Sequence, residues 1–121
     1  MSLKVPQEVR LSPEKNTLTL VYEGQSYALP AEYLRVYSPS AEVRGHGVGQ
    51  ETLQVGKRKV LILALETMGN YALKITYSDG HDSGLYDWNY LYDLALNQAD
   101  HWQDYLGRLD AAGASRDVVV H

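Results

Sequence analysis

Apolar and polar positions alternate over residues 16–23, and this two-residue period predicts a β-strand. Gly24 reverses the chain, so that residues 26–29 are expected to pair with it as a second strand. Pro30 suits the first turn of a helix, where its missing amide hydrogen is not needed, and it predicts a helix over residues 31–37. The first half of the chain should therefore form a hairpin followed directly by a helix.

The same order of elements is predicted further along the chain. A strand candidate at residues 59–66, which is apolar from 60 to 65, and an alternating stretch at residues 71–77 predict a buried central hairpin. The Ser-Asp-Gly sequence at residues 78–80 favours a tight turn, since glycine adopts positive φ readily. Asp87 can accept hydrogen bonds from the free amides of a helix that begins near Trp88.

Weaker patterns assign the remaining segments. Residues 9–11 and 52–55 are expected to form short strands, and the Gly- and Ser-rich residues 38–50 a long surface loop. Residues 98–112 carry apolar side chains at helical spacing, and they either continue the preceding helix or form a second one. Gly113 should end that helix.

The two hairpin-plus-helix units carry similar residues at corresponding positions, which indicates a weak internal repeat. Seven residues of the first unit recur in order in the second, with an offset that grows from 55 to 57: Leu18, Leu20, Tyr22, Gly24, Leu29, Tyr33 and Leu34 match Leu73, Ile75, Tyr77, Gly80, Leu85, Tyr90 and Leu91. Structural pseudo-symmetry and chance likeness both remain open at this point. If the repeat is structural, the apolar faces of the two units would pack together as the core.

These elements define an α+β fold class, with small, mainly antiparallel sheets built from two hairpin-plus-helix units and a C-terminal helix. A chain of 121 residues is large enough for one core and too short for two. We expect residues 1–97 to form the domain, followed by a helix and a frayed tail at residues 98–121. The chain has 10 tyrosines and no phenylalanine, so a thin core with many rings at its edge is expected.

Composition limits the classes of function. A net charge of −4 without a long basic run disfavours nucleic acid and anionic membranes as partners. The absence of cysteine excludes disulfides, thiolate metal sites and cysteine nucleophiles. The N-terminal sequence has no apolar signal core and no apolar run is long enough to span a bilayer, which favours a cytoplasmic protein.

Histidines are the remaining candidates for metal binding or catalysis. None of the four shows the close spacing of a zinc helix or finger. His81 lies between Asp79 and Asp82, so these carboxylates would raise its pKa or orient its ring. The alternative is that Asp79 caps the turn and His81 is an exposed side chain. His46, within the glycine-rich loop, is a weaker candidate.

Two other kinds of site find little support. The alternating glycines at residues 45–49 are not placed between a strand and a helix, as a nucleotide-binding loop requires. A hydrolase could combine Ser38, Ser40 or Ser83 with His46 or His81, but no nucleophile-elbow pattern is present.

Two segments carry a resemblance to a known family: the run from Leu34 through the SPSAE sequence at residues 38–42, and SDGHDSGLYDWNYL at residues 78–91. Over residues 9–94 the chain resembles the small bacterial domain of unknown function DUF971, which is similar to the N-terminal domain of gamma-butyrobetaine hydroxylase. In the hydroxylases this domain precedes a separate iron- and 2-oxoglutarate-dependent catalytic domain, which this sequence lacks. The resemblance therefore implies a binding or assembly module more than an enzyme.

The resemblance also implies an altered zinc site. In the hydroxylases three cysteines and one histidine hold a structural zinc. Here the cysteine positions read Ser38, Ser40 and Val43, and only His81 matches the fourth ligand. Hydroxyls and a valine cannot replace thiolates at zinc, so we expect no bound zinc and no other cofactor. A reorganised site would have to use Glu42, His46, His81 and an Asp.

Two hypotheses for function follow. In the first, the chain is a non-catalytic adaptor for another protein, and residues 38–49 and 79–82 form one continuous surface. The residues of that surface would be Arg35, Ser38, Ser40, Asp79 and Asp82. Relatives attached to ATPases that handle iron–sulfur clusters suggest a link to metal-cofactor assembly, and the C-terminal helix offers a route to a homo-oligomer. In the second, His81 with nearby carboxylates binds a divalent metal or small ligand and supports simple hydrolytic chemistry.

Overall fold

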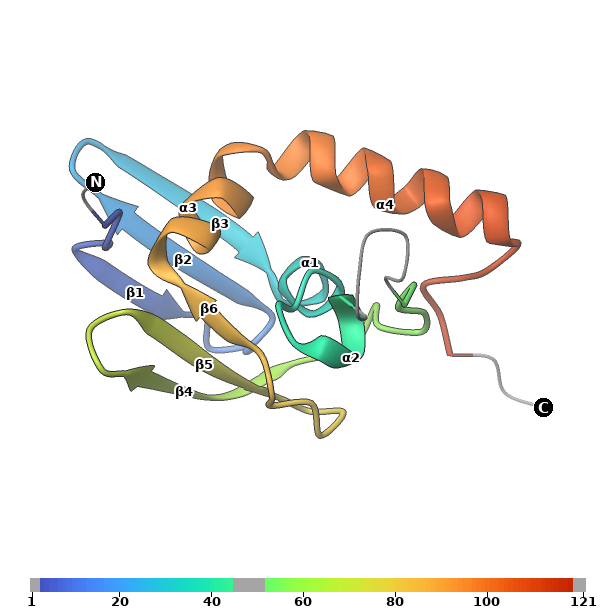
Figure 1. Cartoon of the computed structure of the whole chain (residues 1–121), viewed down its shortest axis with the longest axis horizontal. Helices are drawn as coiled ribbons and strands as arrows, with labels where there is room; N and C mark the ends of the chain where they lie inside the picture. Colours follow the sequence, from blue (N-terminus) through green and yellow to red (C-terminus); the bar gives the residue numbers. More distant parts are fainter. Residues whose placement is uncertain (1–2, 45–51, 119–121) are drawn as a thin grey trace.

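The computed structural model describes residues 3–44 and 52–118 and contains two three-stranded antiparallel sheets with helices packed against them (Figure 1). The first sheet has the strand order β1-β2-β3 and leads directly into helix α1. Its elements are β1 (Glu8–Leu11), β2 (Thr17–Tyr22), β3 (Gln25–Pro30) and α1 (Ala31–Val36). The predicted hairpin followed by a helix is confirmed, with β1 added at the edge.

The second half of the chain repeats this order. The second sheet has the strand order β4-β5-β6 and leads directly into helix α3. Its elements are β4 (Ile62–Met68), β5 (Ala72–Tyr77), β6 (Leu85–Asp87) and α3 (Trp88–Leu96), with a short α2 (Ala41–Arg44) before it and α4 (Gln98–Ala112) after it. The fold is therefore a small α+β fold built from two similar units, as the sequence predicts.

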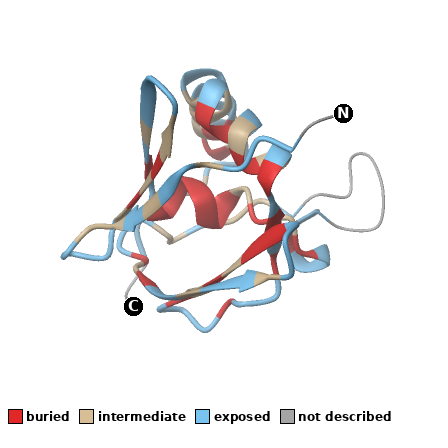
Figure 2. Ribbon diagram, turned by 90° about the vertical axis from the view of Figure 1, so that its left-hand side faces the viewer, coloured by how far each residue is buried: buried red, intermediate tan, exposed pale blue. Residues whose placement is uncertain are grey.

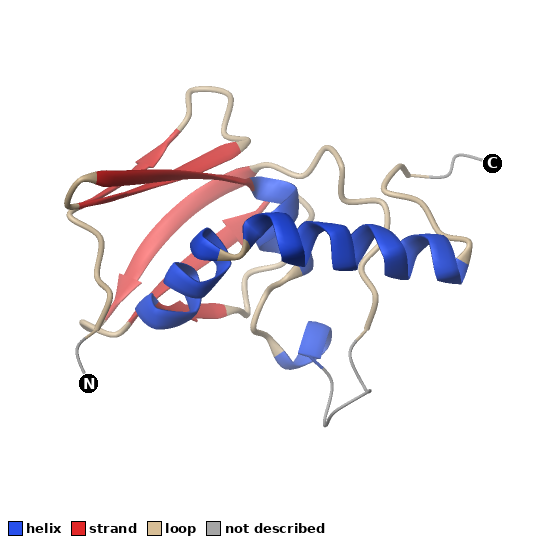
Figure 3. Ribbon diagram, turned by 90° about the horizontal axis from the view of Figure 1, so that it is seen from above, coloured by secondary structure: helices blue, strands red, loops and turns tan. Residues whose placement is uncertain are grey.

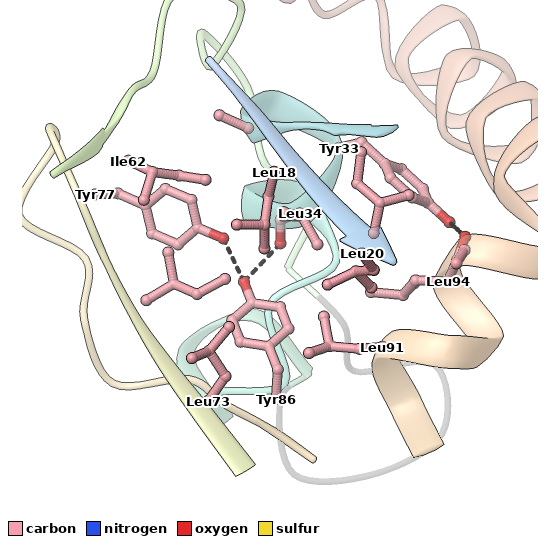
Figure 4. Close-up of a cluster of buried hydrophobic side chains, with 14 of the residues drawn as sticks. Leu18, Leu20, Tyr33, Leu34, Ile62, Leu73, Tyr77, Tyr86, Leu91 and Leu94 are labelled. Carbon is pink, nitrogen blue, oxygen red and sulfur yellow. Dashed lines mark hydrogen bonds between the residues drawn. The ribbon is translucent and has the colours of Figure 1, made fainter. Parts of the chain in front are cut away.

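One core lies between the two units. Figure 2 shows buried residues gathered on the inward sides of the sheets and on a helix at the centre of the molecule. Every residue of α1 is buried. Leucines from the first sheet and α1 pack against Ile62, Leu73 and Ile75 of the second sheet and against Leu91 and Leu94 of α3 (Figure 4).

Buried tyrosines join the two units by hydrogen bonds. The Tyr86 hydroxyl donates to the carbonyl of Leu34 at 2.7 Å, and the Tyr77 hydroxyl lies 2.6 Å from the Tyr86 oxygen (Figure 4). Because the Tyr86 proton is used on the carbonyl, Tyr77 must be the donor to Tyr86. Burial raises the pKa of both phenols, which keeps them protonated and able to donate. Several tyrosines lie at the edge of the core, as expected, but others are completely buried, because a hydrogen bond to a carbonyl or to another hydroxyl satisfies the buried phenol.

The internal repeat is structural, with one change of register. Leu18 pairs with Leu29 across the first hairpin, and Leu73 pairs with Tyr86 across the second. The counterpart of Leu29 is therefore Tyr86, which is fully buried, and not Leu85, which is 39% exposed. Neighbouring residues of a strand face opposite sides, so an error of one position exchanges the core face for the solvent face.

The predicted helix signals are confirmed. The Asp87 carboxylate accepts a 2.8 Å hydrogen bond from the Tyr90 amide at the start of α3. Helix α4 is separate from α3 and ends at Gly113, which has φ of 63° and is in the left-handed region. Helix α4 extends beyond the sheets (Figure 3) and buries Tyr105 and Leu109 against Val36 of the same chain. The apolar stripe of this helix is therefore covered within the monomer.

Three local predictions were wrong. Residues 52–55 form no strand, and α2 lies inside the segment predicted to be all loop. Strand β4 is an edge strand whose residues are mostly exposed, although residues 60–65 are apolar throughout. An uninterrupted apolar run does not distinguish a central strand from an edge strand, because neighbouring segments decide which faces are covered.

Candidate functional site

His81 occupies the centre of the candidate site. It follows a turn closed by hydrogen bonds from the Gly80 amide to the Tyr77 carbonyl at 3.0 Å and from the Tyr77 amide to the His81 carbonyl at 2.9 Å. Gly80 has φ of 88°, which glycine adopts without strain. The Asp79 carboxylate also accepts a 3.2 Å hydrogen bond from the His81 amide. This geometry turns the His81 ring inward, where its side chain is 3% exposed. The alternative of an exposed His81 was wrong.

The His81 imidazole joins the turn to the segment after α1. Its Nε2 lies 2.8 Å from the Ser38 hydroxyl and 3.3 Å from the Ser40 hydroxyl, and its Nδ1 lies 3.3 Å from the Glu42 carboxylate. A carboxylate only accepts, so Nδ1 carries the proton, and Nε2 of the neutral ring accepts from Ser38. Ser38, His81 and Glu42 thus form a hydroxyl–imidazole–carboxylate series.

A glycine allows this close approach. A Cβ atom on Gly84 would lie 2.3 Å from the Ser38 oxygen and 3.1 Å from Cδ of Pro39. Any larger residue at position 84 would displace the serine from His81. The backbone after Pro39 then turns into α2, where the amides of Val43 and Arg44 donate to the Ser40 carbonyl.

An ionic cluster supports the other side of the turn. The Asp79 carboxylate accepts from Arg35 of α1 at 2.9 Å and from Lys57 at 2.6 Å. Burial raises the pKa of Asp79, but hydrogen bonds from Lys57, the His81 amide and Arg35 outweigh it and lower the pKa to about 2. Asp79 is therefore ionised across the physiological range and fixes the turn to α1.

The surroundings of His81 favour its neutral form. Burial and the nearby positive charge of Arg35 lower the pKa of His81, whereas Glu42 and Asp79 raise it, and the net change is downward. A neutral imidazole keeps the Ser38 hydroxyl as donor to Nε2. As predicted, the flanking Asp79 carboxylate raises the His81 pKa, but burial contributes most and makes the net change downward.

The residues of this corner do not suit zinc. Ser38, Ser40 and His81 come together, as the resemblance implies, and the Val43 amide donates to the Ser40 carbonyl, but these residues offer two neutral hydroxyls, a hydrocarbon and one imidazole. Glu42 reaches His81, yet among residues 3–44 and 52–118 no three His, Cys, Asp or Glu side chains are grouped to hold a metal ion. His46 lies outside the described residues, and His101 pairs with Asp93.

The predicted surface residues divide into buried and exposed groups. Arg35, Ser38 and Ser40 are buried and make internal contacts, whereas Asp79 is partly exposed and Asp82 is exposed. Sequence reasoning missed two contributors, Lys57 and Gly84. Lys57 gave no signal because it is 22 residues from Asp79, and the requirement for glycine at position 84 arises only from Ser38 across the fold.

The comparisons with known proteins identify the family. Residues 9–92 match the family model described as gamma-butyrobetaine hydroxylase-like, N-terminal. The chain belongs to this family. No curated protein matches the chain. Within the described residues, no helix has the length and apolar character needed to cross a membrane.

Solved structures related to this family domain agree with the fold. One solution structure determined by NMR has 49% sequence identity and a TM-score of 0.87, and its alignment covers 99% of this chain and 95% of that chain. A second NMR solution structure has 47% identity and a TM-score of 0.78, and its alignment covers 99% of this chain and 92% of that chain. A crystal structure of a DUF971-family protein of unknown function from Acidithiobacillus ferrooxidans has 28% identity and a TM-score of 0.62, and covers 76% of this chain and 93% of its own. None of these descriptions states an activity.

Proposed function

We propose that this chain is a non-catalytic, cytoplasmic protein-binding module whose docking face combines residues 41–44 with residues 79–83. The observation that supports it is the His81 cluster, which holds these two segments side by side through Ser38 and Glu42. Hydrogen bonds among neutral hydroxyls and an imidazole provide the local rigidity that a structural zinc gives elsewhere in the family. Preorganised segments lose less conformational entropy when a partner binds.

Charge indicates the chemistry of the partner. The Glu42 side chain is 73% exposed, and Asp82 is exposed and makes no ion pair with any described residue. Of the cations in this region, Arg35 and Lys57 are both paired with Asp79, and the Arg44 guanidinium lies over the Tyr90 ring. The face therefore presents exposed carboxylates, which suit a partner segment that carries lysine or arginine. Because the chain resembles domains attached to ATPases that handle iron–sulfur clusters, such ATPases are the first partners to examine.

Site-specific photo-crosslinking in cells tests this proposal. A photoreactive amino acid is placed at Glu42 or at Asp82, and in a matched control at Glu23, which is exposed in the corresponding turn of the first hairpin. The expected result is one discrete crosslinked partner from both test positions and none from Glu23. The charge reversal E42K/D82K should abolish the crosslink. Equal or absent crosslinking at all three positions would refute the proposed face.

The Ser38–His81–Glu42 series favours a second candidate function, hydrolysis through an activated serine. The 2.8 Å contact between Ser38 and Nε2 has the geometry in which an imidazole accepts the proton of a nucleophile. Ser38 is only 1% exposed, which places this candidate second. A fluorophosphonate probe distinguishes the two functions. Covalent labelling of Ser38, read by mass spectrometry and lost in S38A, would establish the hydrolase, whereas an unlabelled protein favours the binding module.

A further inference from the structure

A small cavity lies next to the His81 cluster, between the end of α1, helix α2, the segment before β4, and helices α3 and α4. Its volume is about 80 Å³, enough for a few non-hydrogen atoms. The residues that matter for its chemistry are Tyr37, Ser38, Arg44, Tyr90, Tyr105 and Arg108. Ser38 therefore lies at the boundary between this cavity and His81.

The cavity is cationic although the chain is acidic. The charged side chains among its described lining residues are Arg44 and Arg108, and no aspartate or glutamate of the described segments lines it. Asp104, one helical turn before Arg108, lies 3.2 Å from its Nε, but the carboxylate is 66% exposed. An ion pair with so exposed a carboxylate is weakened by solvent. Positive charge inside the cavity is thus only partly compensated.

Aromatic rings hold both guanidinium groups. The Arg44 guanidinium lies 4.7 Å from the centre of the Tyr90 ring, and the Arg108 guanidinium lies 5.8 Å from the centre of the Tyr37 ring. Stacking on a ring occupies the face of a guanidinium and leaves the N–H groups at its edge for an acceptor. The Arg108 Nε is buried and, despite its distance from Asp104, makes no hydrogen bond of acceptable geometry with a described residue.

The tyrosine hydroxyls satisfy these donors only in part, since Arg108 Nη2 donates to the Tyr37 hydroxyl at 3.4 Å. Tyr37, Tyr90 and Tyr105 each donate to a backbone carbonyl, at 2.7, 2.5 and 2.7 Å respectively. Their rings serve as apolar walls, together with Val36, Val43 and Leu53. A ligand for this cavity therefore needs an anionic end that accepts from guanidinium and a short apolar part that contacts the walls.

We propose that this cavity binds a small organic carboxylate, held by Arg44 and Arg108. A carboxylate accepts two parallel N–H bonds from a guanidinium, and its hydrocarbon part replaces water against the aromatic and aliphatic walls. A bare phosphate would lose its hydration against those walls without an equal gain. This site shares Arg44 with segment 41–44 of the docking face proposed above, but it recognises an anion through cations that line the cavity, whereas that face recognises a partner through carboxylates.

An NMR titration of the full chain with sodium propanoate tests the proposal, with propanamide as the neutral isostere and inorganic phosphate as the second anion, all at constant ionic strength. Propanoate should produce saturable amide shifts at Ser38, Val43 and Leu53, and propanamide should produce none. Phosphate should bind at least about tenfold more weakly than propanoate. Shifts that do not saturate, or that are equal for propanamide, would overturn the proposal, as would tighter binding of phosphate.

Variants locate the site. R44Q and R108Q should each raise the propanoate Kd by about tenfold or more, since each removes a charged donor. R58Q is the matched control, because Arg58 is an exposed arginine paired with Asp117 and does not line this cavity. Arg44 is also exposed, so its loss should leave the thermal midpoint unchanged and separate binding from folding. Unchanged propanoate affinity in both R44Q and R108Q would exclude the proposed site.

Discussion

Tyr33 and Tyr90 make reciprocal hydrogen bonds across the junction of the two repeated units. The Tyr33 hydroxyl of α1 donates to the Leu94 carbonyl of α3 at 2.7 Å, and the Tyr90 hydroxyl of α3 donates to the Tyr37 carbonyl after α1 at 2.5 Å. The donors are 57 positions apart in the sequence, and so are the acceptors. Such exchange is the property of a two-fold interface, in which the same patch on each unit contacts its copy. The two units therefore pack with pseudo-two-fold symmetry within one chain.

The reciprocal pair predicts two similar losses of stability. Replacement of either tyrosine by phenylalanine removes the hydroxyl and leaves one backbone carbonyl without its partner. We expect Y33F and Y90F each to lower the free energy of unfolding by about 1–2 kcal/mol, with the larger loss for Y33F because its bond is buried. Urea unfolding followed by circular dichroism measures both. Y71F, which changes a 50% exposed ring, is the control and should be neutral.

The contact between Gly84 and Ser38 predicts a specific rescue. G84A places a methyl group 2.3 Å from the serine oxygen, so we expect it to destabilise the protein by about 1–3 kcal/mol. S38A removes that oxygen, and the double variant G84A/S38A should be more stable than the sum of the single effects predicts. Additive single effects in the double-mutant cycle would contradict this account.

Gly107 provides the matched glycine for that experiment. It lies within α4, and nothing approaches within 4 Å of the position its Cβ would occupy. Alanine restricts the unfolded chain and favours helix, so G107A should stabilise the protein by about 0.5–1 kcal/mol. Thermal unfolding of G84A and G107A should therefore shift in opposite directions, although both changes add one methyl group.

His81 predicts a loss of stability on acidification. Its pKa is lowered in the folded state, mainly by burial, so the unfolded chain takes up a proton more readily. Stability is then fully present above the ordinary histidine pKa of about 6.5 and falls as the pH drops through the folded value. Unfolding measured between pH 7.5 and 5 should show a weaker pH dependence in H81Q than in the wild type. H101Q, at a histidine whose side chain is 32% exposed, serves as the second histidine variant for comparison.

Glu42 provides an independent check on the same histidine. Its carboxylate raises the His81 pKa and so offsets part of the effect of burial. E42Q keeps the size of the side chain but removes the charge, and should lower the His81 pKa further. Histidine ring signals in an NMR titration report that value directly. An unchanged or raised pKa in E42Q would show that the carboxylate does not act on the ring.

The corner around His81 should accept zinc once thiolates are supplied. The triple variant S38C/S40C/V43C supplies thiolates at the three positions that the family resemblance assigns to zinc ligands, and two of these positions contact the His81 imidazole. We expect one Zn²⁺ per chain, intense thiolate-to-metal absorption with Co²⁺, and a higher thermal midpoint in the presence of zinc. The variant S38C/S40C/H81Q, which retains Val43, is the control and should bind neither ion tightly. Failure of the triple variant to bind zinc would mean that these positions do not form a tetrahedral site.

The sequence by itself determined the local elements. The signals that identified these elements act over only a few residues. They are the alternation of apolar and polar residues in β2 and β5, the Asp87 carboxylate at the start of α3 and Gly113 at the end of α4. The resemblance, carried by residues 38–42 and 78–91, also indicated correctly that Ser38, Ser40 and His81 lie together.

Only the tertiary structure decided burial and charge. The sequence placed His81 at a turn, but its burial depends on Ser38 and Gly84, and its net pKa shift depends on burial and on Arg35 of another helix. The cavity with Arg44 and Arg108 likewise joins helices 64 positions apart. Desolvation and electrostatic interactions depend on distance through space, and a sequence pattern records only distance along the chain.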